Sequence, residues 1–211
     1  MTSLSSTSIF SPEILHKFDI HEFRHASAIL KNDFPEELKQ LSDLLQQFQI
    51  THEDIITPGG RKSPIATKFD NVLYGNGWKE KKWDVDVVID GTSNPSPTHN
   101  VDYYKNKIAV ELEWNNKDPF FDRDLNNFRL LHQIGVVSVG IIVTRADELQ
   151  ELFNELGKGS SYGASTTHLG KLMPKIIGGG AAECPLLVLA ITKNACVKEV
   201  KEQIEEAAGE N

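Results

Sequence analysis

Three acidic residues at short spacing, Asp102, Glu111 and Glu113, are the part of this 211-residue chain best suited to chemistry. Residues 108–114 alternate apolar and polar side chains, which predicts a β-strand with Glu111 and Glu113 on one face. Residues 103–107 are typical of a turn, which would bring Asp102 back towards Glu111. Three crowded carboxylates repel one another unless a cation neutralises them, and hard oxygen ligands suit Mg²⁺. Such a site would support phosphoryl chemistry.

The same pattern has a second interpretation. Glu111 and Glu113 could form the solvated face of an edge strand, with Asp102 an ordinary turn residue, because strands with one polar face are common. The spacing of the three acids leaves both interpretations open.

Composition is that of a soluble globular protein, with 39% hydrophobic and 25% charged residues. No apolar run approaches the length of a membrane span, and the first residues are too polar for a signal peptide. Cys184 and Cys196 lack metal-like Cys/His spacing, so we expect a reducing, cytoplasmic location without a membrane. We expect one domain over residues 1–211, with a catalytic core at about 60–192, an N-terminal helical segment at 10–50 and a polar C-terminal tail at 198–211.

Charge is distributed unevenly along the chain. The net charge of −8 argues against a protein that coats nucleic acid indiscriminately. Residues 59–82 nevertheless hold six basic residues against two acidic ones, and residues 158–175 hold three lysines and no acid. Basic patches on an acidic body fit a cleft that grips a polyanion, although ordinary surface variation would give similar local counts.

The order of predicted elements indicates an α/β fold with a central mixed β-sheet flanked by helices. Apolar stripes and caps predict helices at 35–49, 63–73, 119–133 and about 145–156, and apolar runs predict strands at 83–90, 108–114, 136–143 and 186–191. Loops are expected at 91–100 and 159–168, where small, polar and proline residues gather. The carboxylates would then lie at one edge of the sheet, beside the basic loops.

The pattern Asp-x8-Glu-x-Glu between two strands, followed by a helix and a buried strand, resembles the PD-(D/E)xK nuclease superfamily. More narrowly, residues 109–114 (Ala-Val-Glu-Leu-Glu-Trp) and the order of segments over about 60–192 resemble the BglII and BstYI branch of type II restriction endonucleases. The resemblance implies a restriction-endonuclease-like core in which Asp102 and Glu111 are catalytic metal ligands and the Leu112 carbonyl is a third ligand. Glu113 takes the third catalytic position, which holds Lys in much of the superfamily, Gln in BglII-like enzymes and Glu in BamHI-like enzymes.

The function implied by this resemblance is sequence-specific, magnesium-dependent hydrolysis of phosphodiester bonds in double-stranded DNA. One or two Mg²⁺ per active site would activate water, and the products would carry 5′ phosphates. A short palindromic site favours a homodimer, and a cognate DNA methyltransferase would protect the host. Apolar positions on helices 119–133 and 145–156 could form the dimer interface or pack against the chain's own sheet. A repair or junction-resolving nuclease and a non-catalytic DNA-binding module are the alternative functions.

DNA contacts are expected from two basic or polar segments and one lysine. Side chains of the 160–171 segment can hydrogen-bond base edges, although a flexible surface loop is the plainer interpretation. Phosphate contact is the safer role for Arg61, Lys62 and Ser63, and Lys81 could also contact phosphate. Asp84 and Asp86 are expected to flank the sheet, although either could be a supporting metal ligand. The candidate base-reading residues are Ser160, Ser161, Ser165, Thr166, Thr167, His168 and Lys171.

Overall fold

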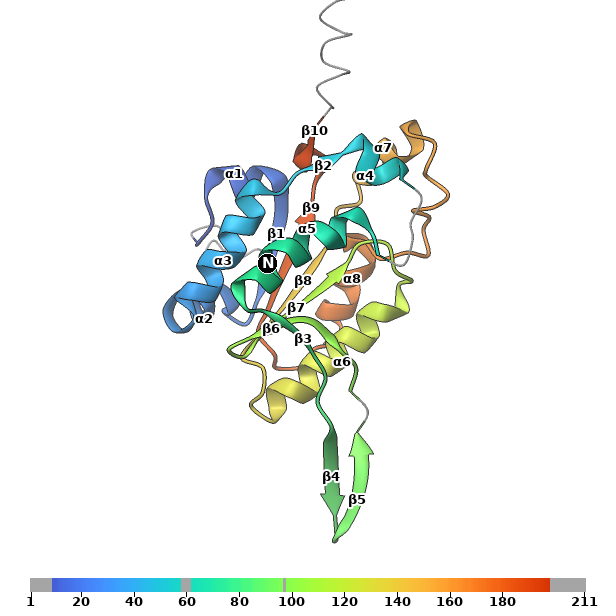
Figure 1. Cartoon of the computed structure of the whole chain (residues 1–211). Helices are drawn as coiled ribbons and strands as arrows, with labels where there is room; N and C mark the ends of the chain where they lie inside the picture. Colours follow the sequence, from blue (N-terminus) through green and yellow to red (C-terminus); the bar gives the residue numbers. More distant parts are fainter. Residues whose placement is uncertain (1–8, 58–61, 97, 198–211) are drawn as a thin grey trace, which may run out of the picture.

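A six-stranded mixed sheet with helices on both faces forms the body of the molecule in the computed structural model (Figure 1). The structure describes residues 9–57, 62–96 and 98–197, so the predicted C-terminal tail 198–211 lies outside the described residues. The sheet order is β1-β9-β8-β7-β6-β3, with β7, β8 and β9 parallel and β1, β6 and β3 antiparallel to their neighbours. These strands are β1 (Phe18–Phe23), β3 (Lys79–Lys81), β6 (Val101–Lys105), β7 (Ile108–Glu113), β8 (Val139–Arg145) and β9 (Leu186–Ile191). The predicted α/β fold with a central mixed sheet is confirmed.

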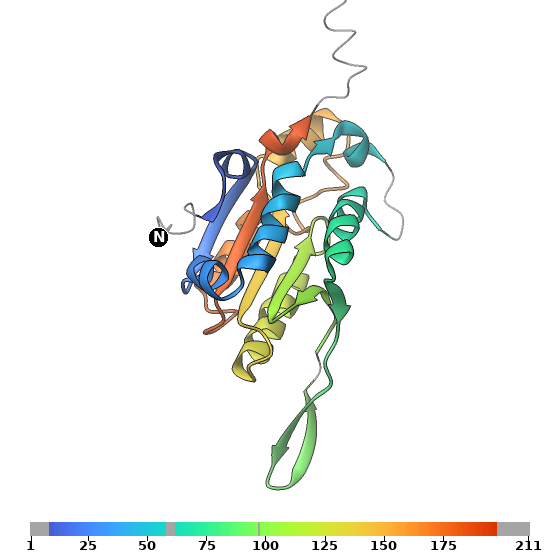
Figure 2. The same cartoon turned by 60° about the vertical axis from the view of Figure 1, so that its left-hand side comes forward.

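Four helices cover one face of the sheet, and Figure 2 shows them from the side. They are α1 (Pro12–Lys17), α2 (Ala26–Asp33), α3 (Pro35–Gln47) and α5 (Pro64–Leu73). The predicted apolar stripe of α3 is buried, and α5 begins where Ser63 accepts a hydrogen bond from the backbone N–H of Ala66. The smaller elements are β2 (Ile50–Thr51), α4 (His52–Ile56), α7 (Leu149–Glu155), β10 (Cys196–Val197) and the 3₁₀ turns η2 (Tyr74–Asn76) and η3 (Lys193–Ala195).

The opposite face is covered by α6 (Pro119–Gln133) and α8 (Leu169–Ile177). The α6 stripe of Phe121, Leu125, Phe128 and Leu131 is buried against the chain's own sheet. A methyl group on Gly140 of β8 would come within 2.5 Å of the Phe128 ring, so this glycine permits the close approach of α6. These apolar positions were expected either to form a dimer interface or to pack against the chain's own sheet, and the α6 stripe does the latter. Leu149 and Phe153 of α7 are likewise buried in the core.

A two-stranded hairpin projects from the sheet, with β4 at Val85–Ile89 and β5 at Thr92–Ser96 (Figure 1). Residues 91–100 were expected to be a loop, and that expectation is wrong for β5. Asp90 and Gly91 both have positive φ, as a type I′ hairpin turn requires, whereas the polar side chains of β5 give no apolar strand signal. Val88 is 65% exposed, so the hairpin lies outside the core.

Other element boundaries also differ from those expected. The N-terminal segment 10–50 is not wholly helical, because β1 alternates buried and more exposed residues as the edge strand beside β9. Residues 103–105 continue β6, and the turn is confined to Asn106 and Lys107, which both have positive φ. The strand expected at 136–143 begins at Val139, and residues 134–138 form the connection between α6 and this strand. Within the described residues, no helix has the length and apolar character needed to cross a membrane.

Candidate active site

Strand β7 places Glu111 and Glu113 on the face of the sheet that α6 covers. All six residues of β7 are buried, and each glutamate is only 1% exposed. Strand β7 lies between β6 and β8, so it is an interior strand. The interpretation of these glutamates as the solvated face of an edge strand is therefore wrong. Buried carboxylates on a central strand are costly unless other groups stabilise them, which makes them candidates for function.

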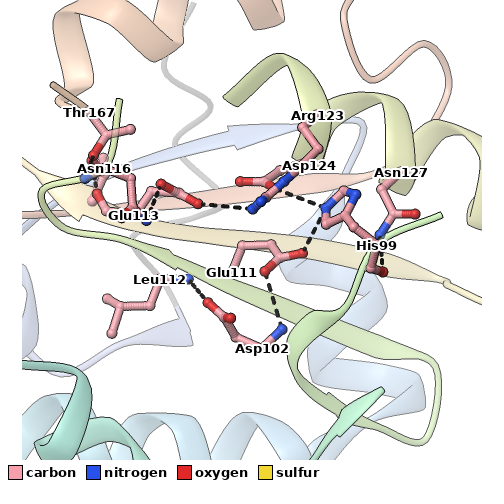
Figure 3. A network of polar contacts seen from close by, with 11 residues as sticks. His99, Asp102, Glu111, Leu112, Glu113, Asn116, Arg123, Asp124, Asn127 and Thr167 are labelled. Atoms are coloured by element: carbon pink, nitrogen blue, oxygen red, sulfur yellow. Dashed lines mark hydrogen bonds and ion pairs between the residues drawn. The ribbon is translucent and has the colours of Figure 1, made fainter. Parts of the chain in front are cut away.

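Asp102 lies directly beside β7, as the spacing predicts (Figure 3). Its backbone N–H donates to Oε2 of Glu111 at 3.2 Å, and its Oδ2 accepts a hydrogen bond from the Leu112 N–H at 2.9 Å. The pairing of β3 with β6 is irregular here, since Lys79 pairs with Tyr104 but Lys81 pairs with Val101. An irregularity of this kind changes the direction in which a side chain points. The carboxylate of Asp102 is thereby directed at the backbone of Leu112, while that of Glu111 points towards His99.

Three residues outside the predicted set, His99, Arg123 and Asp124, complete a polar cluster around the buried glutamates (Figure 3). Nε2 of His99 lies 3.1 Å from Oδ1 of Asp124 and 3.7 Å from Oε1 of Glu111. Arg123 contacts Asp124 at 2.9 Å and Glu113 at 3.5 Å. Asp124 is fully buried because it lies on the apolar stripe of α6. An acidic residue within such a stripe is the sequence signal that could have revealed it.

Burial makes the side chains of Asp102, Glu111 and Glu113 hard to ionise. Loss of hydration and the neighbouring Asp124 raise the pKa of Glu111 well above its ordinary value, and the same causes raise the pKa of Glu113 to about 9. Burial also raises the pKa of Asp102, against the opposing hydrogen bond from the Leu112 N–H. Arg123 lowers the pKa of all three, but a single guanidinium does not balance this many acids.

Two buried oxygens of the cluster have no hydrogen-bond partner among the described residues, Oε1 of Glu111 and Oδ2 of Asp124. Buried polar atoms without partners are rare in folded proteins and call for an unseen water, proton or ion. Ligand atoms of His99, Glu111 and Asp124 all lie within 4.8 Å of one another, close enough to share one cation. The donor set of the site therefore fits a divalent metal.

A cleft of about 470 Å³ opens beside Asp102 and Leu112 on the α5 side of the sheet. Lys62 and Ser63, both predicted phosphate contacts, line this cleft, and Arg61 lies outside the described residues. Lys62 is exposed, forms an ion pair with Asp70 and lies over the ring of Tyr74. The Ser63 hydroxyl caps α5, so its side chain already has a structural role.

The segment expected to read bases divides into exposed and anchored residues. Ser160, Ser161 and Ser165 are exposed. Thr167 is fully buried, and its hydroxyl accepts a hydrogen bond from the backbone N–H of Asn116 at 3.1 Å. Since the Asn116 side chain donates to Glu113 at 2.8 Å, Asn116 links the segment to the catalytic candidate.

The remaining residues of this segment already have partners within the chain. Thr166 accepts a hydrogen bond from the buried Arg145, and His168 pairs with Asp147 at 2.5 Å. Lys171 lies in the first turns of α8, 3.4 Å from Asp118. Of the predicted base-reading residues, the three serines are therefore the most available to a ligand.

Lys81 lies on the exposed edge strand β3, with its ammonium over the rings of Trp83 and Tyr104. This position is close to β6, but nothing brings its side chain into the carboxylate cluster. Asp84 precedes the projecting hairpin and Asp86 belongs to it, which places both beside the sheet rather than among the buried acids.

A comparison with models of known protein families identifies the family of this chain. The model of the restriction endonuclease BglII/BglIII family matches residues 18–191, which include β1, the acidic strand and every strand of the main sheet. The chain is a member of the BglII/BglIII restriction endonuclease family. A comparison with curated proteins finds no matching relative. Membership identifies the chain as a restriction endonuclease, a nuclease whose substrate is double-stranded DNA.

Proposed function

We propose that this endonuclease is a magnesium-dependent type II enzyme that hydrolyses both strands of a short palindromic DNA site. The observation that carries the proposal is the contact of Asp102 with Glu111 and Leu112 beside a cleft that Lys62 lines. Acidic metal ligands beside a cleft that offers a lysine to phosphate are what a metal-dependent attack on a phosphodiester needs.

Asp102, Glu111 and the Leu112 carbonyl would hold one Mg²⁺, and Glu113 would be available to ligate a second. When bound, Mg²⁺ would polarise the scissile phosphate and lower the pKa of the attacking water. Glu113 would orient that water and accept its proton, which a glutamine at the same position cannot do. Asn116 donates a hydrogen bond to Glu113 and fixes the direction of its carboxylate. Attack in line with the 3′ oxygen leaves 5′ phosphates.

Binding of DNA would be divided between phosphate and base contacts. Lys62 and the neighbouring Arg61 and Ser63 would contact phosphates at the cleft, and Lys81 would do so on the edge strand. Ser160, Ser161 and Ser165 would read base edges, with Thr166, Thr167, His168 and Lys171 holding or extending that segment. A palindromic site would be met by a homodimer, and a cognate methyltransferase would protect the host DNA.

The direct test is digestion of phage-sized DNA by the purified chain with Mg²⁺ at about 10 mM or with a chelator. A Glu111→Ala variant tests the site, and Glu155→Ala, at an exposed position of α7, is the matched control. Discrete fragments that require both Mg²⁺ and Glu111, but not Glu155, are the expected result. Intact DNA that is bound at low salt would contradict the proposal, and so would cutting of branched DNA alone.

A further inference from the structure

We propose that His99, Glu111 and Asp124 form a second cation site, separate from the one at Asp102 and Leu112, that binds a divalent transition metal such as Mn²⁺. The two sites would share only Glu111. The proposal goes beyond the endonuclease function, because it depends on the donor atoms of the α6 face and not on cleavage.

The first argument is geometric. Ligands held at about 2.1 Å in an octahedral shell lie about 3.0 Å apart when adjacent and about 4.2 Å apart when opposite. Nε2 of His99 lies 3.1 Å from Asp124 and 3.7 Å from Glu111, and all the ligand atoms lie within 4.8 Å of one another. Three different segments, the residues before β6, strand β7 and helix α6, bring these atoms to one point (Figure 3).

The second argument is the state of the buried oxygens. Oδ1 of Asp124 already accepts hydrogen bonds from Nε and a terminal nitrogen of Arg123, and it also contacts Nε2 of His99. Its Oδ2 has no hydrogen-bond partner among the described residues, and the same holds for Oε1 of Glu111. Both side chains are at least 98% buried, so bulk water does not satisfy these atoms. A cation between them would do so.

The balance of charge points the same way. Glu111, Glu113 and Asp124 lie together on this face, and the Arg123 guanidinium contacts Glu113 and Asp124 but forms no ion pair with Glu111 among the described residues. The His99 imidazole contacts Oδ1 of Asp124 at 3.1 Å and reaches Glu111 only at 3.7 Å, so it leaves Oδ2 of Asp124 without a hydrogen-bond partner among the described residues. A divalent cation bound by His99, Glu111 and Asp124 would supply positive charge beside these carboxylates.

The chemistry of the ligands selects the class of metal. Imidazole suits transition cations, whereas Mg²⁺ prefers oxygen ligands and keeps its waters. One histidine with two carboxylates therefore favours Mn²⁺ or Zn²⁺ over Mg²⁺. The supporting contacts are those of a ligand shell, because Arg123 holds the Asp124 carboxylate and the Asn127 side chain donates to the His99 carbonyl at 3.5 Å.

The test is pulsed electron paramagnetic resonance of tag-free, full-length protein with Mn²⁺ and without DNA. The expected spectrum shows coupling of Mn²⁺ to an imidazole nitrogen, which the all-oxygen site at Asp102 cannot produce. His99→Gln should remove this coupling and one bound Mn²⁺ per chain. Asp102→Asn should leave the coupling unchanged, and so should His25→Gln, which alters an exposed histidine at the start of α2.

Wild-type protein that binds Mn²⁺ without nitrogen coupling would overturn the proposal, as would coupling that persists in His99→Gln. The wild-type spectrum needs no variant, so a misfolded mutant cannot obscure the result. Nitrogen coupling in a protein that cuts no DNA would contradict the proposed endonuclease mechanism but would still support this cation site. Loss of cleavage in Asp102→Asn with the coupling intact would support both.

Discussion

The backbone N–H of Asp102 donates to the Glu111 carboxylate at 3.2 Å across two antiparallel strands. This contact joins the first two members of the acidic pattern without any direct bond between their carboxylates. Glu111 is held from one side by the β6 backbone and faces His99 on the other, while Asp102 is held by the Leu112 N–H. The two acids are thus fixed in position before any ligand binds, as an active site requires.

Glu111→Gln should separate folding from catalysis. A glutamine oxygen can still accept the Asp102 N–H, so the melting temperature should stay within a few degrees of wild type. The loss of a metal-binding charge should lower the single-turnover cleavage rate by at least about 10³-fold. Stopped-time digestion of a single-site duplex beside a thermal melt measures both. Cleavage at the wild-type rate would remove Glu111 from the metal site.

Glu113→Gln tests whether this carboxylate accepts a proton. Gln keeps the hydrogen bond from Asn116 but cannot serve as a base, so cleavage should slow by about 10²-fold while DNA affinity stays unchanged. Glu155→Gln is the matched control at an exposed position. An unchanged rate in Glu113→Gln would mean that the residue only orients water, as glutamine does in the BglII-like branch.

The stability of the chelated protein should fall as pH rises. The pKa of Glu113 is raised from an ordinary value of 4.5 to about 9, so the folded state binds its proton more tightly than the unfolded state does. This contribution to stability is complete below about pH 4.5 and is lost progressively up to about pH 9. Between pH 6 and 8.5 the wild type should lose about 1 to 3 kcal/mol that Glu113→Gln does not lose.

Urea denaturation at several pH values in chelator measures this effect, and Glu155→Gln should follow the wild type. Saturating divalent metal should flatten the wild-type curve, because a cation stabilises the ionised carboxylates. Parallel pH curves for wild type and Glu113→Gln would show that Glu113 is ionised in the folded protein at neutral pH.

Lys62→Gln should weaken binding of DNA of any sequence and reduce the slope of log affinity against log salt by about 0.9. The reason is that Lys62 is an exposed cation on the wall of the cleft beside Asp102. Lys31→Gln, on the exposed side of α2, removes the same charge away from the cleft and should leave the slope unchanged. Fluorescence anisotropy in chelator checks both variants. Equal slopes for Lys62→Gln and the wild type would show that DNA does not bind at Lys62.

Local patterns in the sequence predicted the strand and helix that matter most for the site. Alternation over 108–114 placed Glu111 and Glu113 on one face of β7, and the recurrence of apolar residues every three or four positions identified the buried stripe of α6. Both signals are strong because burial imposes a period on the side chains. The β4–β5 hairpin was missed because β5 carries only polar residues and proline, which leaves the Asp90-Gly91 turn as its main signal.

The remainder of the cluster depends on tertiary contacts that a sequence pattern does not contain. His99 lies just before β6, and Asp124 lies in the second turn of α6. The two side chains meet only because α6 packs against β7. Thr167 was expected at the DNA, yet the backbone of Asn116 holds it in the interior. Whether a polar residue in a loop faces a ligand or anchors the loop is decided by packing, which the order of residues does not state.

The most direct test of the central claim is to sequence both ends of every fragment that the enzyme produces from phage-sized DNA in Mg²⁺. The account predicts one short sequence with two-fold symmetry at all ends, cut symmetrically on both strands and carrying 5′ phosphates. Ends without a common sequence, or fragments that appear equally with Glu111→Ala, would contradict it.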